Sequence, residues 1–212
     1  MGARAAVFVD GNNWYHALRG IGMSDLGRLS YPRICSKLLG PTRDWVSMRY
    51  YVGQVNQAEE AKQYADQRRF ISKLEASDAR ITVRLGRLET RYVNSSAASE
   101  LLGYLGSLKT RIDTTVYKDL IGLGQRHQRF PVKIEKAVDV MLAVEMVVQA
   151  ERGEYDCAYL LSADGDFTPA VEAVRGLGKK VYIGSPAYGA CLAAAANAYI
   201  RLDSAWFGDC WA

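Results

Sequence analysis

The sequence predicts an α/β fold of three layers, in which a mostly parallel central sheet is flanked by helices. Short apolar runs alternate with helical stretches along the 212 residues, and this is the pattern of strands joined by crossover helices. Two of the apolar runs lead into aspartate, one directly and the other after two residues. The carboxyl ends of parallel strands are where open α/β sheets hold functional groups, so the same pattern also predicts where a site lies.

Six strands are expected, each a short apolar run bounded by polar or turn residues. They cover residues 5–9, 46–52, 81–85, 157–161, 180–183 and 199–202. The clearest helix covers residues 57–76, which are charged on one side and apolar on the other. A second helix is expected to begin at residues 136–140 and to lead into the fourth strand. This helix is expected to be largely buried because it is rich in apolar residues, namely Val140, Leu142, Val144, Met146 and Val147.

The strand at residues 157–161 runs into Ser-Ala-Asp-Gly-Asp, which places Asp164 and Asp166 at its carboxyl end. Such a strand, apolar throughout, is expected to be covered on both faces. The two carboxylates are therefore candidates for a metal site. The same residues also suit a turn without chemical function, because Gly165 tolerates a positive φ and aspartate caps helices.

The first strand, at residues 5–9, ends in Asp10. In a parallel sheet this carboxylate would lie at the same edge as Asp164 and Asp166. Converging carboxylates repel one another, and each resists ionisation unless a cation binds them. Mg²⁺ or Mn²⁺ suits such a site, because both prefer oxygen ligands and bind substrate phosphate as well.

Asp139 follows Lys136 near the start of the second predicted helix. It is a further candidate ligand for the same cation. An acidic residue in the first turn is also explained by the helix dipole alone, so its position leaves both interpretations open.

Five segments serve as motifs: VFVDGNN at residues 7–13, EKAVDVMLAVEM at 135–146, YDCAYLLSADGDFTPAVEAV at 155–174, GKKVYI at 178–183 and AYIRLDS at 198–204. Together they resemble the NYN-domain family of the PIN-like nuclease superfamily, in its LabA-like branch. Proteins of this family are metal-dependent ribonucleases. The resemblance therefore implies an acidic quartet of Asp10, Asp139, Asp164 and Asp166, with Asn13 supporting Asp10 and Ser162 beside the metal or the scissile phosphate.

The sequence departs from the family pattern at two positions. Glu145 stands where this branch often has aspartate, and Asn197 stands where an aspartate commonly precedes the last strand. Neither position belongs to the quartet, so these differences concern the surroundings of the site more than its activity.

Composition indicates an ordinary globular chain, with 49% hydrophobic and 24% charged residues. We expect a single domain over residues 1–212, with an insertion at approximately 88–132. The first apolar run is too short for a signal peptide or membrane span. The four cysteines show no CxxC or zinc-like spacing, so a reduced, cytoplasmic protein without membrane association is expected. The two histidines, His16 and His127, are too few for a histidine-based zinc site or a serine hydrolase triad.

The middle of the chain is more basic than the rest. Residues 84–133 contain nine basic and four acidic residues, a net charge of +5, compared with +4 for the whole chain. Tyrosines are interleaved with the basic residues, as is common where phosphates are neutralised and bases stack. The candidate RNA-binding residues are Arg84, Arg87, Lys109, Arg111, Lys133 and Lys136. An ordinary solvated insertion has the same composition and remains the alternative.

These observations predict an Mg²⁺- or Mn²⁺-dependent ribonuclease, with endonucleolytic cleavage taken from the family. The alternative is a non-catalytic RNA-binding or regulatory module of the same fold. A phosphatase or a Toprim-type domain is more distant, because the first would need a second aspartate at Asn12 and the second a glutamate at Asp10. The expected partner is RNA. The apolar tail with Trp206, Phe207 and Trp211 is expected either to pack on the core or to support a homodimer.

Overall fold

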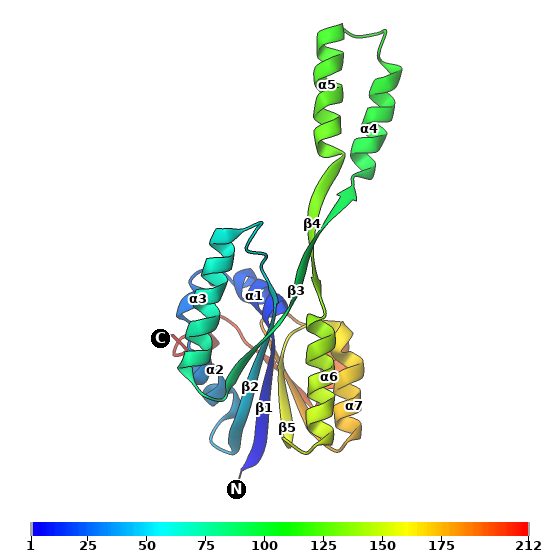
Figure 1. The fold of residues 1–212 in the computed structure, drawn as a ribbon. Coiled ribbons are helices and arrows are strands. Elements are labelled where there is room, and N and C mark those ends of the chain that lie inside the picture. Colours follow the sequence, from blue (N-terminus) through cyan, green and yellow to red (C-terminus); the bar gives the residue numbers. More distant parts are fainter. Residues whose placement is uncertain (1, 212) are drawn as a thin grey trace. The chain divides into compact units, whose positions relative to one another are not determined.

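The computed structural model describes residues 2–211, apart from the side chains of Lys133 and Glu135. Strands and helices alternate over most of the chain (Figure 1). The strands are β1 (Ala3–Asp10), β2 (Arg43–Gln54), β3 (Ile81–Asn94), β4 (Arg129–Lys136), β5 (Cys157–Leu161), β6 (Lys180–Ser185) and β7 (Ala198–Arg201). The helices are α1 (Gly11–Gly20), α2 (Tyr31–Leu39), α3 (Ala61–Ser77), α4 (Ser96–Ser107), α5 (Thr114–His127), α6 (Val138–Glu151), α7 (Thr168–Gly176) and α8 (Ala190–Ala195).

Within the described residues the strands form one seven-stranded sheet in the order β4-β3-β2-β1-β5-β6-β7. The pairs β1–β2, β1–β5, β2–β3, β5–β6 and β6–β7 are all parallel. The predicted α/β class with a mostly parallel sheet is confirmed. All six predicted strands are present, and β5 has the predicted bounds.

Alternation along the strands builds a core on each face of the sheet. On β1, Val7 and Val9 belong to one buried cluster, whereas Ala6 and Phe8 belong to the other. The first cluster also contains residues of α1 and α2, and the second contains residues of α6, α7 and α8. Helices thus cover both faces, which gives the three predicted layers.

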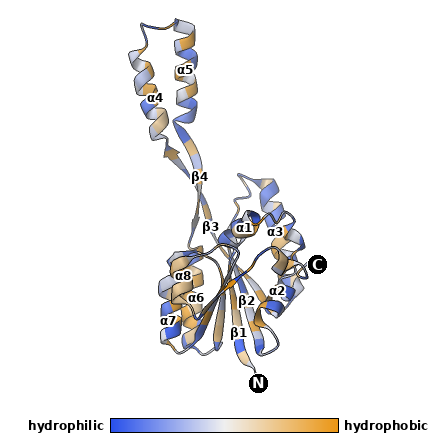
Figure 2. Cartoon of the chain, turned by 180° about the vertical axis from the view of Figure 1, so that it is seen from behind, coloured by the Kyte–Doolittle hydropathy of each residue, from blue (hydrophilic) through white to orange (hydrophobic). Residues whose placement is uncertain are grey.

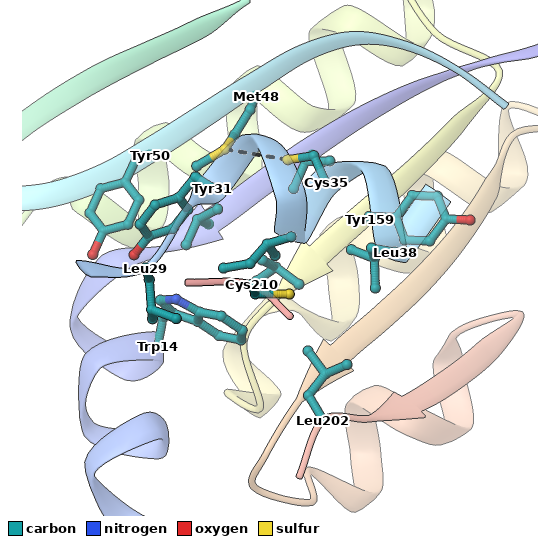
Figure 3. Packing of buried hydrophobic residues seen from close by; sticks show 14 of the residues in the cluster. Trp14, Leu29, Tyr31, Cys35, Leu38, Met48, Tyr50, Tyr159, Leu202 and Cys210 are labelled. Atoms are coloured by element: carbon teal, nitrogen blue, oxygen red, sulfur yellow. Dashed lines mark hydrogen bonds between the residues drawn. The ribbon is translucent and has the colours of Figure 1, made fainter. Parts of the chain in front are cut away.

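The first of these clusters includes the C-terminal segment (Figure 3). Phe207 is fully buried and its ring contacts Trp14 edge to face, with ring centroids 5.9 Å apart. Trp206 and Trp211 pack against the same cluster. Of the two interpretations of this apolar tail, core packing is therefore the one that the structure shows.

Two expectations about helices need correction. The helix predicted from residue 57 begins at Ala61, and the one predicted from residue 136 begins at Val138 because Lys136 still belongs to β4. The latter helix, α6, is also less buried than expected: Val140 is 66% and Val144 is 54% exposed. Its buried side instead consists of Val138, Leu142, Met146, Gln149 and Ala150.

The chain divides into two compact units, one formed by residues up to Arg87 and from Lys136, the other by Leu88–Glu135. In the second unit α4 and α5 pack against each other, and Gly124 lies so close to Leu102 that an added Cβ would be 2.7 Å from its Cδ2. The expectation of a single domain with an insertion at approximately 88–132 stays a prediction. Among the described residues no helix is both long and apolar enough to cross a membrane.

Candidate functional site

The carboxyl ends of β1 and β5 are adjacent at the point where the order of the sheet reverses. Val9 is opposite Leu161 in the parallel pair, so Asp10 at the end of β1 lies beside Ser162, the first residue after β5. From β1 the sheet continues through β2 and β3 on one side and from β5 through β7 on the other. Ligands of open α/β sheets bind in the crevice at such a reversal.

Asp10 is almost completely buried, with 3% of its surface exposed. Its carboxylate accepts hydrogen bonds from the backbone nitrogen of Asn13 at 3.2 Å and from the hydroxyl of Ser162 at 3.0 Å. Burial raises the pKa of Asp10 to about 6; these two hydrogen bonds act against the increase, and the charges of Asp139 and Asp164 add to it. A bound cation would therefore lower the free-energy cost of ionising Asp10.

Ser162 connects Asp10 to the second pair of carboxylates. It is fully buried, and its hydroxyl oxygen accepts a hydrogen bond from the backbone nitrogen of Asp164 at 3.0 Å while donating to Asp10. The carboxylate of Asp164 in turn accepts from the backbone nitrogen of Asp166 at 3.0 Å, as the cap of a short 3₁₀ turn over Gly165–Phe167. Asp164 therefore also has the capping role that the turn interpretation gave it.

The loop after β5 is held from two further directions. The side-chain oxygen of Asn13 accepts a hydrogen bond from the backbone nitrogen of Ala163 at 3.0 Å. Gly189, after β6, lies against the same residue, because a Cβ there would be 2.2 Å from the carbonyl oxygen of Ala163. Only glycine fits at position 189, and the position of the Asp164 loop depends on it.

Asp139 lies in the first turn of α6, as predicted. The preceding Ala137 has a φ of 70°, which is uncommon for a residue with a side chain and frequent near functional sites. Although Asp139 is an exposed residue, partial burial of its carboxylate is the largest cause that raises its pKa, followed by the charges of Asp164 and Asp166. All four carboxylates are thus linked by mutual repulsion.

The oxygen donors of the quartet fit a hard divalent cation. Their positions are not those of a closed metal cage: among the described residues no three His, Cys, Asp or Glu side chains lie close enough together to hold a metal ion. Carboxylates that repel one another approach more closely when a cation offsets the repulsion.

Glu145 on α6 has partners of its own. It accepts a hydrogen bond from the hydroxyl of Tyr51 at 2.9 Å and forms ion pairs with Arg49 at 3.3 Å and Arg84 at 3.2 Å. Arg49 also donates to the side chain of Gln149 at 2.5 Å. Burial raises the pKa of Tyr51, and the neighbouring charge of Glu145 raises it further. Glu145 therefore stabilises the packing of α6 on β2 and β3.

The second departure from the family pattern, Asn197, also has a local partner. Its side-chain oxygen accepts a hydrogen bond from the backbone nitrogen of Val181 at 2.8 Å. Asn197 thus joins the segment before β7 to β6.

The candidate RNA-binding residues lie in different elements. Arg84 is paired with Glu145, Arg87 is an exposed residue of β3, and Lys136 ends β4. Lys109 and Arg111 are exposed between α4 and α5, whereas Lys133 belongs to β4 and its side chain is outside the described part of the structure. Residues 96–127, with four basic and three acidic residues, have a net charge of only +1. The excess positive charge of the middle segment therefore belongs to the strands β3 and β4 and not to the helices.

Two exposed tyrosines near the site were not expected from the sequence. Tyr15, two residues after Asn13, is 49% exposed, and Tyr188, directly before Gly189, is 71% exposed. The ring of Tyr188 stands edge to face on Tyr199 at 5.1 Å. The only sequence signal was the dipeptide Tyr188-Gly189 shortly after a predicted strand, at the sheet edge where ligands bind.

Two of three comparisons with known proteins agree with this architecture, and the third finds no match. The crystal structure of a protein of unknown function, VPA0982 from Vibrio parahaemolyticus RIMD 2210633, matches with a TM-score of 0.57 and 17% sequence identity, over 96% of this chain and 94% of that chain. At this identity the likeness shows a shared fold alone. Among curated proteins no match is found. The family model described as the NYN domain matches residues 4–203, and the chain is therefore a member of the NYN-domain family.

Proposed function

We propose that this chain is a metal-dependent ribonuclease of the LabA-like branch, which hydrolyses RNA phosphodiester bonds as an endonuclease. Membership of the NYN family supports the nuclease class, because this family belongs to the PIN-like nuclease superfamily. The observation that supports the site is the buried carboxylate of Asp10, at the point where the strand order of the sheet reverses. Its pKa is raised to about 6, mainly by burial, and the negative charges of Asp139 and Asp164 contribute to the increase.

The residues that would hold Mg²⁺ or Mn²⁺ are Asp10, Asp139, Asp164 and Asp166. When bound, such an ion supplies a water of lowered pKa and neutralises charge on the leaving oxygen. Ser162 and Asn13 are positioning residues: Ser162 orients the Asp10 carboxylate, and Asn13 fixes the backbone at Ala163. Asp139 is an exposed residue, unlike the buried Asp10, and would be the fourth ligand or the residue that orients the attacking water.

An RNA strand is the proposed partner, with its phosphates neutralised by Arg84, Arg87, Lys109, Arg111, Lys133 and Lys136. The concentration of positive charge on β3 and β4 supports this proposal. Tyr15 and Tyr188 would stack on unpaired bases, which favours a single-stranded substrate. A cytoplasmic location agrees with the four cysteines, all of which are free thiols in this structure.

The second candidate is an RNA-binding module of the same fold without catalysis. It is favoured by one observation, that the described carboxylates do not form a cluster compact enough for a metal ion. The two candidates differ in whether the purified protein cleaves RNA when Mn²⁺ is present.

The deciding experiment incubates the protein with total cellular RNA and Mn²⁺ and maps the new RNA ends. Asp10→Asn and Asp164→Asn should each reduce cleavage at least about 100-fold, because each removes a proposed metal ligand. Changes to residues that only support a ligand already cost about 10- to 100-fold. Asp66→Asn is the matched control, because it removes an exposed carboxylate of α3. Cleavage by Asp10→Asn protein at the rate of the control would reject the assignment, and so would cleavage that persists in EDTA.

A further inference from the structure

The unit that contains α4 and α5 has very little core of its own. Ala98 and Leu105 are its buried hydrophobic residues among those described. Glycines inside the two helices weaken them further, and they are Gly103, Gly106, Gly122 and Gly124. A helical pair of this kind needs additional apolar contacts to be stable.

Each helix carries a stripe of exposed apolar side chains. On α4 the stripe contains Leu101, 48% exposed, and Tyr104, 63% exposed. On α5 it contains Val116, Leu120 and Leu123, which are 51%, 37% and 45% exposed. The spacings of three and four residues are those of a helix face that packs on other helices. Both helices show such hydrophobic positions in Figure 2.

The two stripes lie on the same side of the helical pair. On α4, Leu101 and Tyr104 directly precede Leu102 and Leu105, the residues that face α5. On α5, Leu123 directly precedes Gly124, which contacts Leu102 of α4. One residue corresponds to a rotation of about 100° around a helix. Because α4 and α5 run in opposite directions, this same step turns both stripes toward one side, where they form a continuous apolar face.

This apolar face contains no charged residue, and residues 96–127 have a net charge of only +1. Nucleic acid would require phosphate-neutralising cations on the face. Contact with a second copy of the same surface requires a face with little charge, because two strongly charged identical faces would repel each other. The charge distribution therefore favours self-association over RNA.

We infer that two copies of the chain associate through this face, α4 and α5 of each copy forming a four-helix bundle with two-fold symmetry. Helices of 12 and 14 residues are about 18 and 21 Å long and pack about 9 Å apart. The face then covers roughly 400 Å² per copy, which is at the low end for specific interfaces. The dimer is therefore expected to be weak and reversible.

Sedimentation velocity on the full chain between about 1 and 200 µM tests the interface, because a weak dimer dissociates on dilution. The mass of the wild-type protein should rise from the 23.5 kDa of one chain toward twice that value. Leu120→Arg places a charge in the face and should weaken association roughly 30-fold or more. Gln125→Arg adds the same charge to an exposed position of α5 outside the stripe and should leave association within about threefold.

A second measurement covers the case in which Leu120→Arg unfolds the helices. Hydrogen exchange of the wild-type chain should show backbone amides of α4 and α5 that become protected as protein concentration rises. A monomer at every concentration would overturn the inference, and so would equal weakening by Leu120→Arg and Gln125→Arg. Association that requires RNA would assign the face to nucleic acid instead.

Discussion

Among the four carboxylates of the site, that of Asp10 differs most from an ordinary aspartate, because its pKa is raised from 3.8 to about 6. The folded state therefore binds the Asp10 proton more tightly than the unfolded state does. The resulting stabilisation is fully present below pH 3.8 and is lost as the pH rises through about 6. Without metal, this loss is expected to be about 2 to 3 kcal/mol of unfolding free energy between pH 4 and 7.

Urea unfolding in EDTA at these two pH values measures the effect. Asp10→Asn should remove most of the decrease, because an amide does not ionise, whereas the control Asp66→Asn should retain it. Parallel pH profiles for wild-type and Asp10→Asn protein would show that the pKa of Asp10 is not raised.

Asp139 and Glu145 are six residues apart on α6, which places them roughly 120° apart around the helix. They cannot both face one small site. Asp139→Ala should eliminate cleavage, because Asp139 is the residue coupled to Asp164 and Asp166. Glu145→Gln should keep at least part of the cleavage rate with a similar Mn²⁺ requirement, but lower the unfolding free energy by about 1 to 3 kcal/mol, because Arg49 is left less neutralised.

Cleavage assays and chemical denaturation on both variants separate the two roles. A metal-bound structure with Glu145 among the ligands and Asp139 turned away would contradict this ordering. The sequence predicted Asp10, Asp164 and Asp166 as candidates because strand ends in a parallel sheet converge. It gave no signal for the partners of Glu145, because Tyr51 and Arg84 lie on strands far away in the chain and only the sheet register brings them together.

At the scale of elements, the contact between Gly189 and Ala163 joins the loop after β6 to the loop after β5. Gly189 has a φ of −100°, so its replacement by alanine strains no backbone angle and tests the contact alone. Gly189→Ala should displace the Asp164 loop and weaken Mn²⁺ binding about 10-fold or more. The control Gly176→Ala adds the same methyl group where nothing lies within 4 Å, and calorimetric titration should find its Mn²⁺ affinity unchanged.

The basic residues of β3 and of the turn between α4 and α5 lead to a prediction for RNA binding. If Arg87, Lys109 and Arg111 contact phosphates, replacing all three with alanine should reduce the salt dependence by about 0.7 log units per lost contact with single-stranded RNA. Arg84→Ala should have an additional effect on stability, since it also removes an ion pair of Glu145. Filter binding over a range of salt concentrations measures the slope, and an unchanged slope in the triple variant would mean that these residues are merely solvated.

At the scale of the whole molecule, the sequence predicted the class of fold because apolar strands alternate with helices over most of the chain. The missing part was β4 and the second half of β3, where charged residues such as Arg87, Arg91 and Arg129 interrupt any apolar run. The helices α4 and α5 were missed for a related reason. Their apolar residues occupy both an inward and an outward stripe, and their glycines weaken the helical pattern.

The last prediction concerns a shortened chain from which residues 88–135 are removed. The residues on the two sides of this deletion lie next to each other, because a Cβ on Gly86 would be 2.8 Å from the carbonyl oxygen of Lys136. Joining Arg87 to Lys136 through a short glycine-containing turn should therefore leave both buried clusters of the larger unit intact, since neither contains a residue of the removed segment. The melting temperature should change by no more than about 5 °C. Circular dichroism and thermal melts measure this outcome.

The shortened chain also separates the roles of the two units. It retains Asp10, Asp139, Asp164 and Asp166, so Mn²⁺-dependent cleavage of a very short RNA should persist. It lacks Lys109 and Arg111, so long RNA should bind more weakly, and it lacks the apolar face of α4 and α5, so sedimentation should find one chain at every concentration. A shortened chain that folds but no longer cleaves short RNA would show that the quartet alone is insufficient and that the segment between Leu88 and Glu135 takes part in the reaction.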